Sequence, residues 1–226
     1  MLSMSEPFNS FHYDDLSIDL HPEVYEPAED TFGLSESIIL PKKASVLELG
    51  AGCGLISLVC AQRGASVVCT DINPHAVRLI QRNYEKNRSK IKGSFEVRKG
   101  NLFDPIGANE TFDVIIFNPP YLPTAKKEKV GGWFDVAIDG GADGLAVTKR
   151  FITEVSTYLK TAGSAYFIFS SLSPKKQLDK YLFSSKQSYE IVQSRWYHDE
   201  RLDVYRLYSL HPHKMSDEGE RMGKTF

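Results

Sequence analysis

SVLELGAGCG, residues 45–54, is the stretch of sequence that decides the fold. Its first half, Ser45 to Leu49, is an apolar run of strand length, and glycines follow directly after it. The next stretch, Leu55 to Arg63, carries apolar side chains at helical spacing and stops at Gly64, a residue suited to a helix C-terminus. A strand, a glycine-rich turn and a helix in this order are typical of the first unit of a βαβ fold.

The same alternation of short apolar runs and longer amphipathic stretches continues along the chain. It predicts further strands at Ser66–Thr70, Phe95–Lys99, Val114–Phe117, Ala165–Ser170, Tyr189–Trp196 and Val204–Leu210. It predicts helices from Pro74 to near Asn87, from about Asp143 to Lys160 with a break at Gly163, and from Ser173-Pro174 to about Phe183. We therefore expect an α/β fold with a seven-stranded, mostly parallel sheet, helices on both faces and a C-terminal antiparallel hairpin.

The 226 residues suffice for one sizeable domain with a single core. We assign this domain to residues 41–210. Residues 1–40 form a lead-in that is mixed and polar up to about position 20 and ends in a short helix through Ile39, stopped by Pro41. Residues 211–226 are polar and carry too little apolar surface to offset the entropy of ordering, so we expect a mobile tail.

The composition argues against several classes of protein. The longest apolar runs are of strand length, and the N-terminus lacks the features of a secretion signal, so we expect a cytoplasmic protein without a membrane span. A net charge of -2 gives no general attraction to nucleic acid, although a local basic patch stays possible. The cysteines, Cys53, Cys60 and Cys69, lack the spacing of a zinc site, so we expect buried, reduced thiols and propose no metal.

The glycine-rich turn predicts a ligand of nucleoside type. A dinucleotide fingerprint that starts at Gly50 requires glycine at position 55, where this chain has Leu55. The carboxylate of Glu48 favours a cationic group over a pyrophosphate. At the tip of the next strand, Asp71 is placed to accept hydrogen bonds from both hydroxyls of a ribose, and Asn101, after the third strand, to pair with the edge of an adenine. Taken singly, these residues are also ordinary as a loop glycine, a helix-capping aspartate and a turn asparagine.

The sequence Asn118-Pro119-Pro120-Tyr121 ends the apolar run Val114–Phe117. Two prolines in succession cannot continue a central strand, so they form a stiff exit from it. Because ligands of parallel sheets bind at the carboxyl ends of strands, Asn118 and Tyr121 are expected at the site of chemistry. An amide and an aromatic face together suit the handling of a planar NH2 group. Taken alone, the sequence is also compatible with a rigid turn that exposes an aromatic ring.

In combination these motifs resemble the class I methyltransferases that use S-adenosylmethionine, over about Tyr25 to Leu210. ELGAGCG is similar to the family's first motif, DIN at 71–73 to its ribose-binding acidic motif, and FNPPY at 117–121 to the branch that methylates planar nitrogens. VYEPAEDT at 24–31 is similar to the HemK-type protein-glutamine methyltransferases of the archaeal and eukaryotic group, as are AIDGGADGL at 137–145 and RLDVYRL at 201–207. The resemblance implies a Rossmann-like fold.

The resemblance also implies roles for individual residues. Thr31 in the lead-in contacts the methionine end of the cofactor, Glu48 and Gly50 its amino group, and Asp71 its ribose. Asn101 stands where the family usually has aspartate. The cofactor site then comprises Thr31, Glu48, Gly50, Gly52, Gly54, Asp71, Asn101 and Asn118. For the transfer itself, Asn118 and the Pro119 carbonyl accept the two N–H bonds of the substrate amide and Tyr121 stacks on it.

The substrate that the family implies is the glutamine of the Gly-Gly-Gln motif in a class 1 translation release factor, methylated at N5. Relatives in this group work with a small zinc-binding activator subunit, and the strand Phe95–Lys99 is a candidate edge for it. Two alternatives stay open: an adenine-N6 methyltransferase acting on DNA or RNA, and a non-catalytic nucleotide-binding adaptor. Trp133 and Phe134 either line the substrate groove or anchor a loop, and the lysines at 126, 127 and 129 suit a solvated loop.

Overall fold

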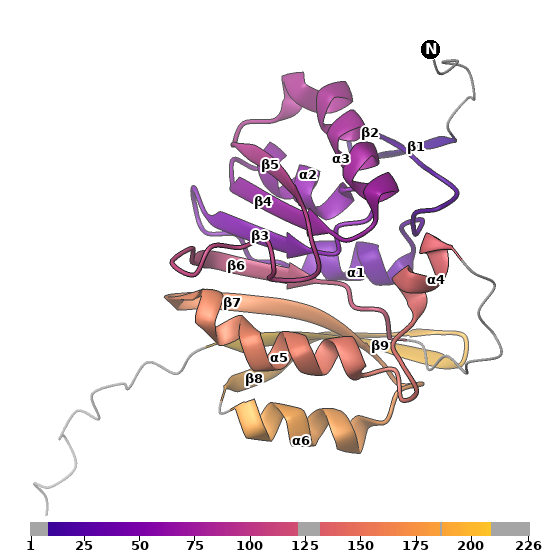
Figure 1. Ribbon diagram of the computed structural model, residues 1–226, viewed down its shortest axis with the longest axis vertical. Coiled ribbons are helices and arrows are strands. Elements are labelled where there is room, and N and C mark those ends of the chain that lie inside the picture. Colours follow the sequence, from indigo (N-terminus) through magenta and orange to yellow (C-terminus); the bar gives the residue numbers. More distant parts are fainter. Residues whose placement is uncertain (1–8, 122–131, 186, 209–226) are drawn as a thin grey trace, which may run out of the picture.

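The computed structural model describes residues 9–121, 132–185 and 187–208. Its centre is a sheet of seven strands (Figure 1). In the order in which they lie side by side, the strands are β5 (Phe95–Lys99), β4 (Ser66–Asp71), β3 (Ser45–Leu49), β6 (Phe112–Phe117), β7 (Leu159–Ser170), β9 (Glu200–Tyr208) and β8 (Ser188–Tyr197).

The direction of the strands divides the sheet into two parts. From β5 to β7 all neighbours are parallel, which requires a crossover between successive strands. β9 is antiparallel to both β7 and β8. The prediction of a seven-stranded, mostly parallel sheet with a C-terminal antiparallel hairpin is therefore confirmed.

Helices cover both faces of this sheet (Figure 1). One face carries α1 (Glu29–Ser37), α2 (Leu55–Gln62) and α3 (Pro74–Asn87), and the other carries α5 (Ala146–Tyr158) and α6 (Lys175–Ser185). A short helix, α4 (Trp133–Ile138), lies beyond the carboxyl end of β6, and a 3-10 turn (Arg88–Lys90) follows α3. None of the helices in the described part of the chain combines the length and the apolar composition needed to span a bilayer.

Side chains of the central strands point alternately to the two faces of the sheet and so contribute to two separate halves of the core. In β6, Val114 and Ile116 pack with residues of α1 and α2, whereas Ile115 and Phe117 pack with residues of α5 and α6. Because side chains of a strand point to opposite faces in turn, an uninterrupted apolar run is what a strand buried on both faces requires. The carboxyl ends of the five parallel strands, β5 to β7, therefore lie at one edge of the sheet.

The N-terminal lead-in contains a hairpin that the sequence analysis did not predict. Its strands are β1 (Ser10–Tyr13) and β2 (Leu16–Asp19), and the side chains of Leu16 and Ile18 are fully buried against α2 and α3. The hairpin lies beside α3 (Figure 1). The lead-in is thus packed onto the domain rather than separate from it. The tail at 211–226 lies outside the described residues.

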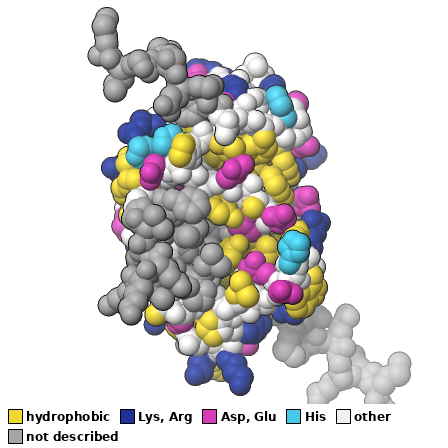
Figure 2. All heavy atoms as spheres, turned by 90° about the vertical axis from the view of Figure 1, so that its right-hand side faces the viewer, with side chains coloured by type: hydrophobic (Ala, Val, Ile, Leu, Met, Phe, Trp, Pro, Cys, Tyr) yellow, Lys and Arg dark blue, Asp and Glu magenta, His cyan; other side chains and the backbone are white. Residues whose placement is uncertain are grey.

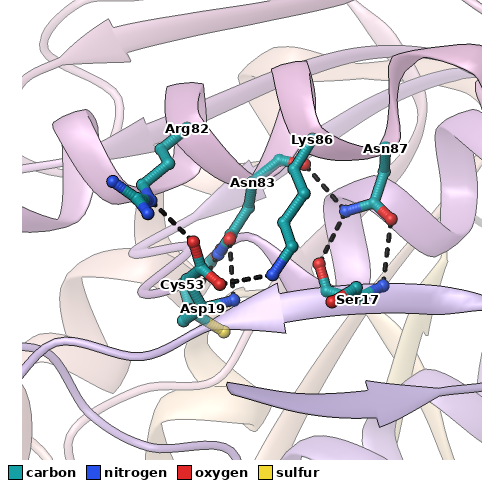
Figure 3. A network of polar contacts seen from close by, with 7 residues as sticks. All are labelled: Ser17, Asp19, Cys53, Arg82, Asn83, Lys86 and Asn87. Carbon is teal, nitrogen blue, oxygen red and sulfur yellow. Dashed lines mark hydrogen bonds and ion pairs between the residues drawn. The ribbon is translucent and has the colours of Figure 1, made fainter. Parts of the chain in front are cut away.

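A buried polar network joins the hairpin to α3 (Figure 3). The Asn83 side chain accepts from the Asp19 N–H at 2.8 Å and donates to the carbonyls of Asp19 and Cys53. The Asn87 side chain, one turn later, accepts from the Ser17 N–H at 2.9 Å and donates to the Ser17 carbonyl at 2.8 Å. Two amides at spacing i, i+4 therefore pair with the backbone of β2 as a neighbouring strand does. We call the following set the hairpin network: Ser17, Asp19, Cys53, Arg82, Asn83, Lys86 and Asn87.

The prediction that Gly163 ends a helix is wrong. α5 ends at Tyr158, and β7 begins at Leu159 and contains Gly163. The pairing of β7 with β6 is irregular here, because Phe112 lies opposite Leu159 while Val114 lies opposite Ser164. A Cβ atom on Gly163 would lie 2.9 Å from the Phe112 carbonyl oxygen, so glycine permits the close backbone approach of a bulge.

Candidate active site

A pocket of about 400 Å³ opens at the carboxyl ends of β3, β4 and β6. Its lining residues come from segments spread over the chain, at 24–31, 48–56, 71–76, 100–102, 117–121 and 133–147. Figure 2 faces this end of the molecule and shows apolar and acidic side chains beside one another. The pocket brings together nearly all the residues that the sequence analysis singled out: Thr31, Glu48, Gly50, Gly52, Asp71, Asn101, Asn118, Pro119 and Tyr121.

The glycine-rich turn forms the floor of the pocket next to β3. Gly50, Gly52 and Gly54 all have positive φ angles, of 58°, 58° and 83°. Gly54 is the N-cap of α2 and is not among the lining residues. A Cβ atom there would lie 3.1 Å from the Ile80 side chain, so this glycine serves the packing of α2 against α3. Gly50 and Gly52 let the backbone approach the pocket.

Glu48 is a buried carboxyl at the end of β3 and is 4% exposed. It accepts a short hydrogen bond from the Ser57 hydroxyl of α2. Burial raises the pKa of Glu48 to about 8, against the lowering effect of Ser57, and the nearby Asp71 adds to the rise. Since Glu48 and Asp71 face one pocket, a cationic ligand group is the partner that would stabilise their charged forms.

Asp71 lies at the tip of β4, as expected, and is 8% exposed. One carboxylate oxygen accepts from the Gly52 N–H at 2.9 Å and the other from the Asn73 N–H at 2.8 Å. Burial raises the pKa of Asp71, while these backbone N–H groups favour its charged form. The two bonds fix the carboxylate against the glycine-rich turn and leave acceptor capacity on both oxygens. Asn101 lies on the neighbouring wall, exposed to solvent, after β5.

Asn118 and Tyr121 line the pocket at the exit of β6. The Asn118 Nδ2 group donates to Asp30 Oδ2 at 2.9 Å, and its second contact is Thr31 Oγ1 at 3.5 Å. The Tyr121 hydroxyl donates to Asp30 Oδ2 at 3.3 Å, and the Ser173 hydroxyl donates to the Tyr121 carbonyl at 2.7 Å. Asn118 Oδ1 is buried and is one of the few buried side-chain nitrogen or oxygen atoms in the described residues without a hydrogen-bond partner.

Asp30 is the site residue that sequence reasoning missed. It is 3% exposed, lies in the first turn of α1, and also accepts from the Tyr25 hydroxyl at 3.1 Å. The only signal in the sequence was its place in the VYEPAEDT segment. Nothing there indicates that it meets Asn118, which follows 88 positions later. We call the following set the corner cluster: Tyr25, Asp30, Thr31, Asn118 and Tyr121.

The residues after the NPPY corner form part of the same wall. Trp133 at the start of α4 is half-buried and lines the pocket, and its backbone N–H donates to Glu23 Oε2 at 3.0 Å. Asp139, from the AIDGGADGL segment, also lines it. Trp133 therefore lines the pocket from the start of a helix rather than from a loop, and its contact with substrate stays a prediction. The lysines at 126, 127 and 129 lie outside the described residues.

The cysteines are buried and unpaired with one another, as predicted. Burial raises the pKa of Cys53, in the glycine-rich turn, to about 12, with a further rise from the Glu48 carboxyl. Burial likewise raises the pKa of Cys60 and Cys69. The thiols are therefore kept in their neutral, weakly nucleophilic form.

Comparison with known proteins gives one consistent assignment. Residues 34–133 match the family described as Methyltransferase small domain. The putative protein N5-glutamine methyltransferase MJ0928 of Methanocaldococcus jannaschii is 45% identical over 163 residues, covering 72% of this chain and 80% of that protein. The human methyltransferase HEMK2 is 32% identical over 154 residues, covering 65% of this chain and 71% of that protein.

A solved structure of similar fold is the E. cuniculi Mtq2-Trm112 complex, responsible for the methylation of the eRF1 translation termination factor. It aligns with a TM-score of 0.64 and 25% identity, over 83% of this chain and 99% of that chain. Sequence, fold and pocket therefore agree, and the chain belongs to the HemK-type family of protein N5-glutamine methyltransferases.

Proposed function

We propose that this protein transfers a methyl group from S-adenosylmethionine to the side-chain nitrogen of the glutamine in the Gly-Gly-Gln motif of a class 1 translation release factor. The observation that carries the proposal is the buried, unpartnered Oδ1 atom of Asn118 in a pocket that the carboxyls of Glu48 and Asp71 also line. A buried acceptor without a partner is costly, so it indicates a ligand that brings an N–H group.

The residues of the pocket fit S-adenosylmethionine better than they fit a dinucleotide. Two buried carboxyls, Glu48 and Asp71, suit an amino group and a ribose, whereas a pyrophosphate beside them would oppose their ionisation. Gly50 and Gly52 provide a floor without side chains. The cofactor supplies an electrophilic methyl group carried on a sulfonium centre.

Each candidate residue then has a defined role in binding. Thr31 contacts the methionine end of the cofactor, Glu48 and Gly50 its amino group, Asp71 its ribose hydroxyls and Asn101 its adenine. The backbone N–H of Gly52 donates to the Asp71 carboxylate and so holds it in position, and Gly54 is the N-cap that begins α2. Because Thr31 belongs to the lead-in, residues 1–40 complete the cofactor site on the domain formed by residues 41–210.

The chain's own groups would prepare the nitrogen for transfer. A carboxamide nitrogen is a weak nucleophile because its lone pair is delocalised over the amide. Asn118 Oδ1 and the Pro119 carbonyl would accept hydrogen bonds from its two N–H groups and stabilise the positive charge that develops on the nitrogen. The ring of Tyr121 would hold the planar amide flat. Fixing the nitrogen in this way lowers the barrier by several kcal/mol, on the order of what positioned reactants gain.

A protein partner has a suitable docking edge in β5. This strand ends the sheet and is paired only with β4 among the described residues, so one row of its backbone groups faces outward. The Mtq2-Trm112 complex is an assembly of a related chain with a second subunit. We propose that a small activator subunit extends the sheet at β5 by strand addition.

The test is transfer of labelled methyl groups to purified release factor, with DNA and RNA as competing acceptors, with and without a candidate activator. We expect label on the release factor alone, mapped by mass spectrometry to the Gly-Gly-Gln glutamine and absent when that glutamine is replaced by glutamate. Label on adenine would instead identify a nucleic-acid methyltransferase. Tight binding of cofactor with no transfer to any acceptor would favour an adaptor.

A further inference from the structure

The carboxylate of Asp30 is the meeting point of the corner cluster. Its Oδ2 atom accepts from Asn118 Nδ2, the Tyr121 hydroxyl and the Tyr25 hydroxyl. Resting on the proposed function, we propose that Asp30 is a positioning residue for methyl transfer, which sets the orientation of the Asn118 amide and thereby aims its oxygen at the substrate nitrogen.

The orientation of the Asn118 amide follows from what faces it. The oxygen and nitrogen of an amide have nearly the same shape, so only their partners decide which way the group turns. Asp30 Oδ2 lies 2.9 Å from Asn118 Nδ2, and Thr31 Oγ1 lies 3.5 Å from it. The reverse orientation would press the amide oxygen against a carboxylate oxygen at the same distance. Oδ1 is therefore forced away from Asp30, and it is this atom that is buried without a partner.

Asp30 is itself held firmly enough to impose this choice. Its Oδ1 atom accepts from the Thr31 N–H at 2.6 Å and from the Thr31 hydroxyl at 3.1 Å. It lies in the first turn of α1, where the helix dipole favours a negative charge. These contacts leave its carboxylate little freedom to turn away from Asn118.

The same carboxylate fixes the aromatic side of the site. Tyr25 and Tyr121 both line the pocket and both donate their hydroxyl hydrogen to Asp30 Oδ2. Burial and the charge of Asp30 raise the pKa of both tyrosines, so that they remain neutral donors. One side chain of the lead-in thus orients both the amide and the ring that are proposed to hold the substrate.

The first test is Asp30→Asn, which keeps the shape of the side chain. Its amide can donate to Asn118 Oδ1, which allows the Asn118 amide to turn and present its NH2 group to the substrate. We expect the turnover number to fall about 100-fold, while the dissociation constant for S-adenosylmethionine stays within about threefold. Asp113→Asn is the matched control, because Asp113 accepts from Ser45 and Lys160 near the opposite ends of the strands. It should leave turnover unchanged.

The second test is a rescue that only a positioning role predicts. Asn118→Asp alone should place two carboxylates against each other and lose most of the activity. In the double variant Asp30→Asn/Asn118→Asp, the amide at 30 donates to one oxygen of the new carboxylate and leaves its other oxygen toward the substrate. We expect turnover at least about tenfold above either single variant. A double variant no better than the poorer single variant would overturn the proposal.

An NMR readout separates this inference from the proposed function. The side-chain NH2 signals of Asn118 should be protected from solvent exchange in the wild type and lose that protection in Asp30→Asn, with or without any substrate. Wild-type protein that methylates no release factor would refute the proposed function, yet these signals would still test Asp30. Unchanged NH2 signals in Asp30→Asn, or unchanged turnover, would contradict the positioning role. So would a loss confined to cofactor affinity.

Discussion

The hairpin network and the corner cluster are both buried polar clusters that join the lead-in to the domain, yet they are completed differently. In the hairpin network, Asn83 and Asn87 use both the oxygen and the nitrogen of their side-chain amides (Figure 3). In the corner cluster, Asn118 uses its nitrogen and leaves its oxygen without a partner. A satisfied network stabilises and specifies the fold, whereas an unsatisfied atom held in a pocket is available to a ligand.

The largest effect should come from Asn118→Ala. It removes the proposed acceptor for the substrate nitrogen, so turnover should fall by about 100-fold or more. The free energy of unfolding should fall by only about 1–2 kcal/mol, because Oδ1 makes no hydrogen bond and the Asp30 carboxylate, which loses the Asn118 Nδ2 donor, keeps its other donors. Single-turnover kinetics and urea unfolding measure the two quantities. Unchanged turnover would refute the role of the amide.

The opposite pattern should follow from Asn83→Ala in the hairpin network. The backbone groups of Asp19 and the carbonyl of Cys53 then lose their buried partner, so the free energy of unfolding should fall by about 3 kcal/mol. Turnover at a temperature where the protein remains folded should change much less. Gln62→Ala, which removes an exposed bond to Asp15, is the control and should cost below about 1 kcal/mol. A stability loss equal to that of the control would show that the network is dispensable.

Glu48 provides a prediction of pH dependence in the cofactor pocket. Its pKa of about 8 means that the carboxyl is protonated below that pH, and a cationic amino group favours the ionised form. Binding then releases a proton, so the affinity for S-adenosylmethionine should rise with pH toward about pH 8 and fall above it, where the cofactor's own α-amino group loses its charge. Calorimetry from about pH 6 to pH 9 measures the slope. Glu48→Gln should flatten it, and an identical slope in that variant would exclude Glu48 as its source.

The smallest effect is expected at the rim of the hairpin network. Arg82 donates to Asp19 at 2.6 Å, but its side chain is 53% exposed. Lys86 also pairs with Asp19. Exposed ion pairs contribute little, so Arg82→Met should lower the free energy of unfolding by less than about 1 kcal/mol. A loss of unfolding free energy as large as that of Asn83→Ala would show that the charged pairs, and not the amides, contribute most of the network's stability.

The bounds of strands and helices were predicted most accurately where apolar runs end at glycine or proline. The predicted bounds of β3 agree with the structure, and those of β5 and α3, predicted approximately, agree closely, because Gly50, Gly100 and Pro74 mark their ends. The hairpin β1–β2 was missed because its strands have four residues each and carry as many polar as apolar side chains. Such short strands gain their stability from the amides of α3, which lie far away in the sequence.

The residues of the candidate site also fall into those that the sequence predicted and one that it did not. Glu48 and Asp71 lie at the carboxyl ends of buried strands and Asn118 follows one directly, so strand topology alone brings them together. Asp30 could not be predicted, because its role depends on how α1 docks against the exit of β6. That docking is a tertiary contact over 88 positions, and no local pattern encodes it.

The most direct measurement is a crystal structure with S-adenosylhomocysteine and a peptide containing the Gly-Gly-Gln motif. We predict that the glutamine side-chain nitrogen lies within about 3.2 Å of Asn118 Oδ1, with the Asn118 nitrogen still on Asp30. A peptide bound with its glutamine amide outside this pocket, or an Asn118 oxygen turned onto another protein group, would contradict the account.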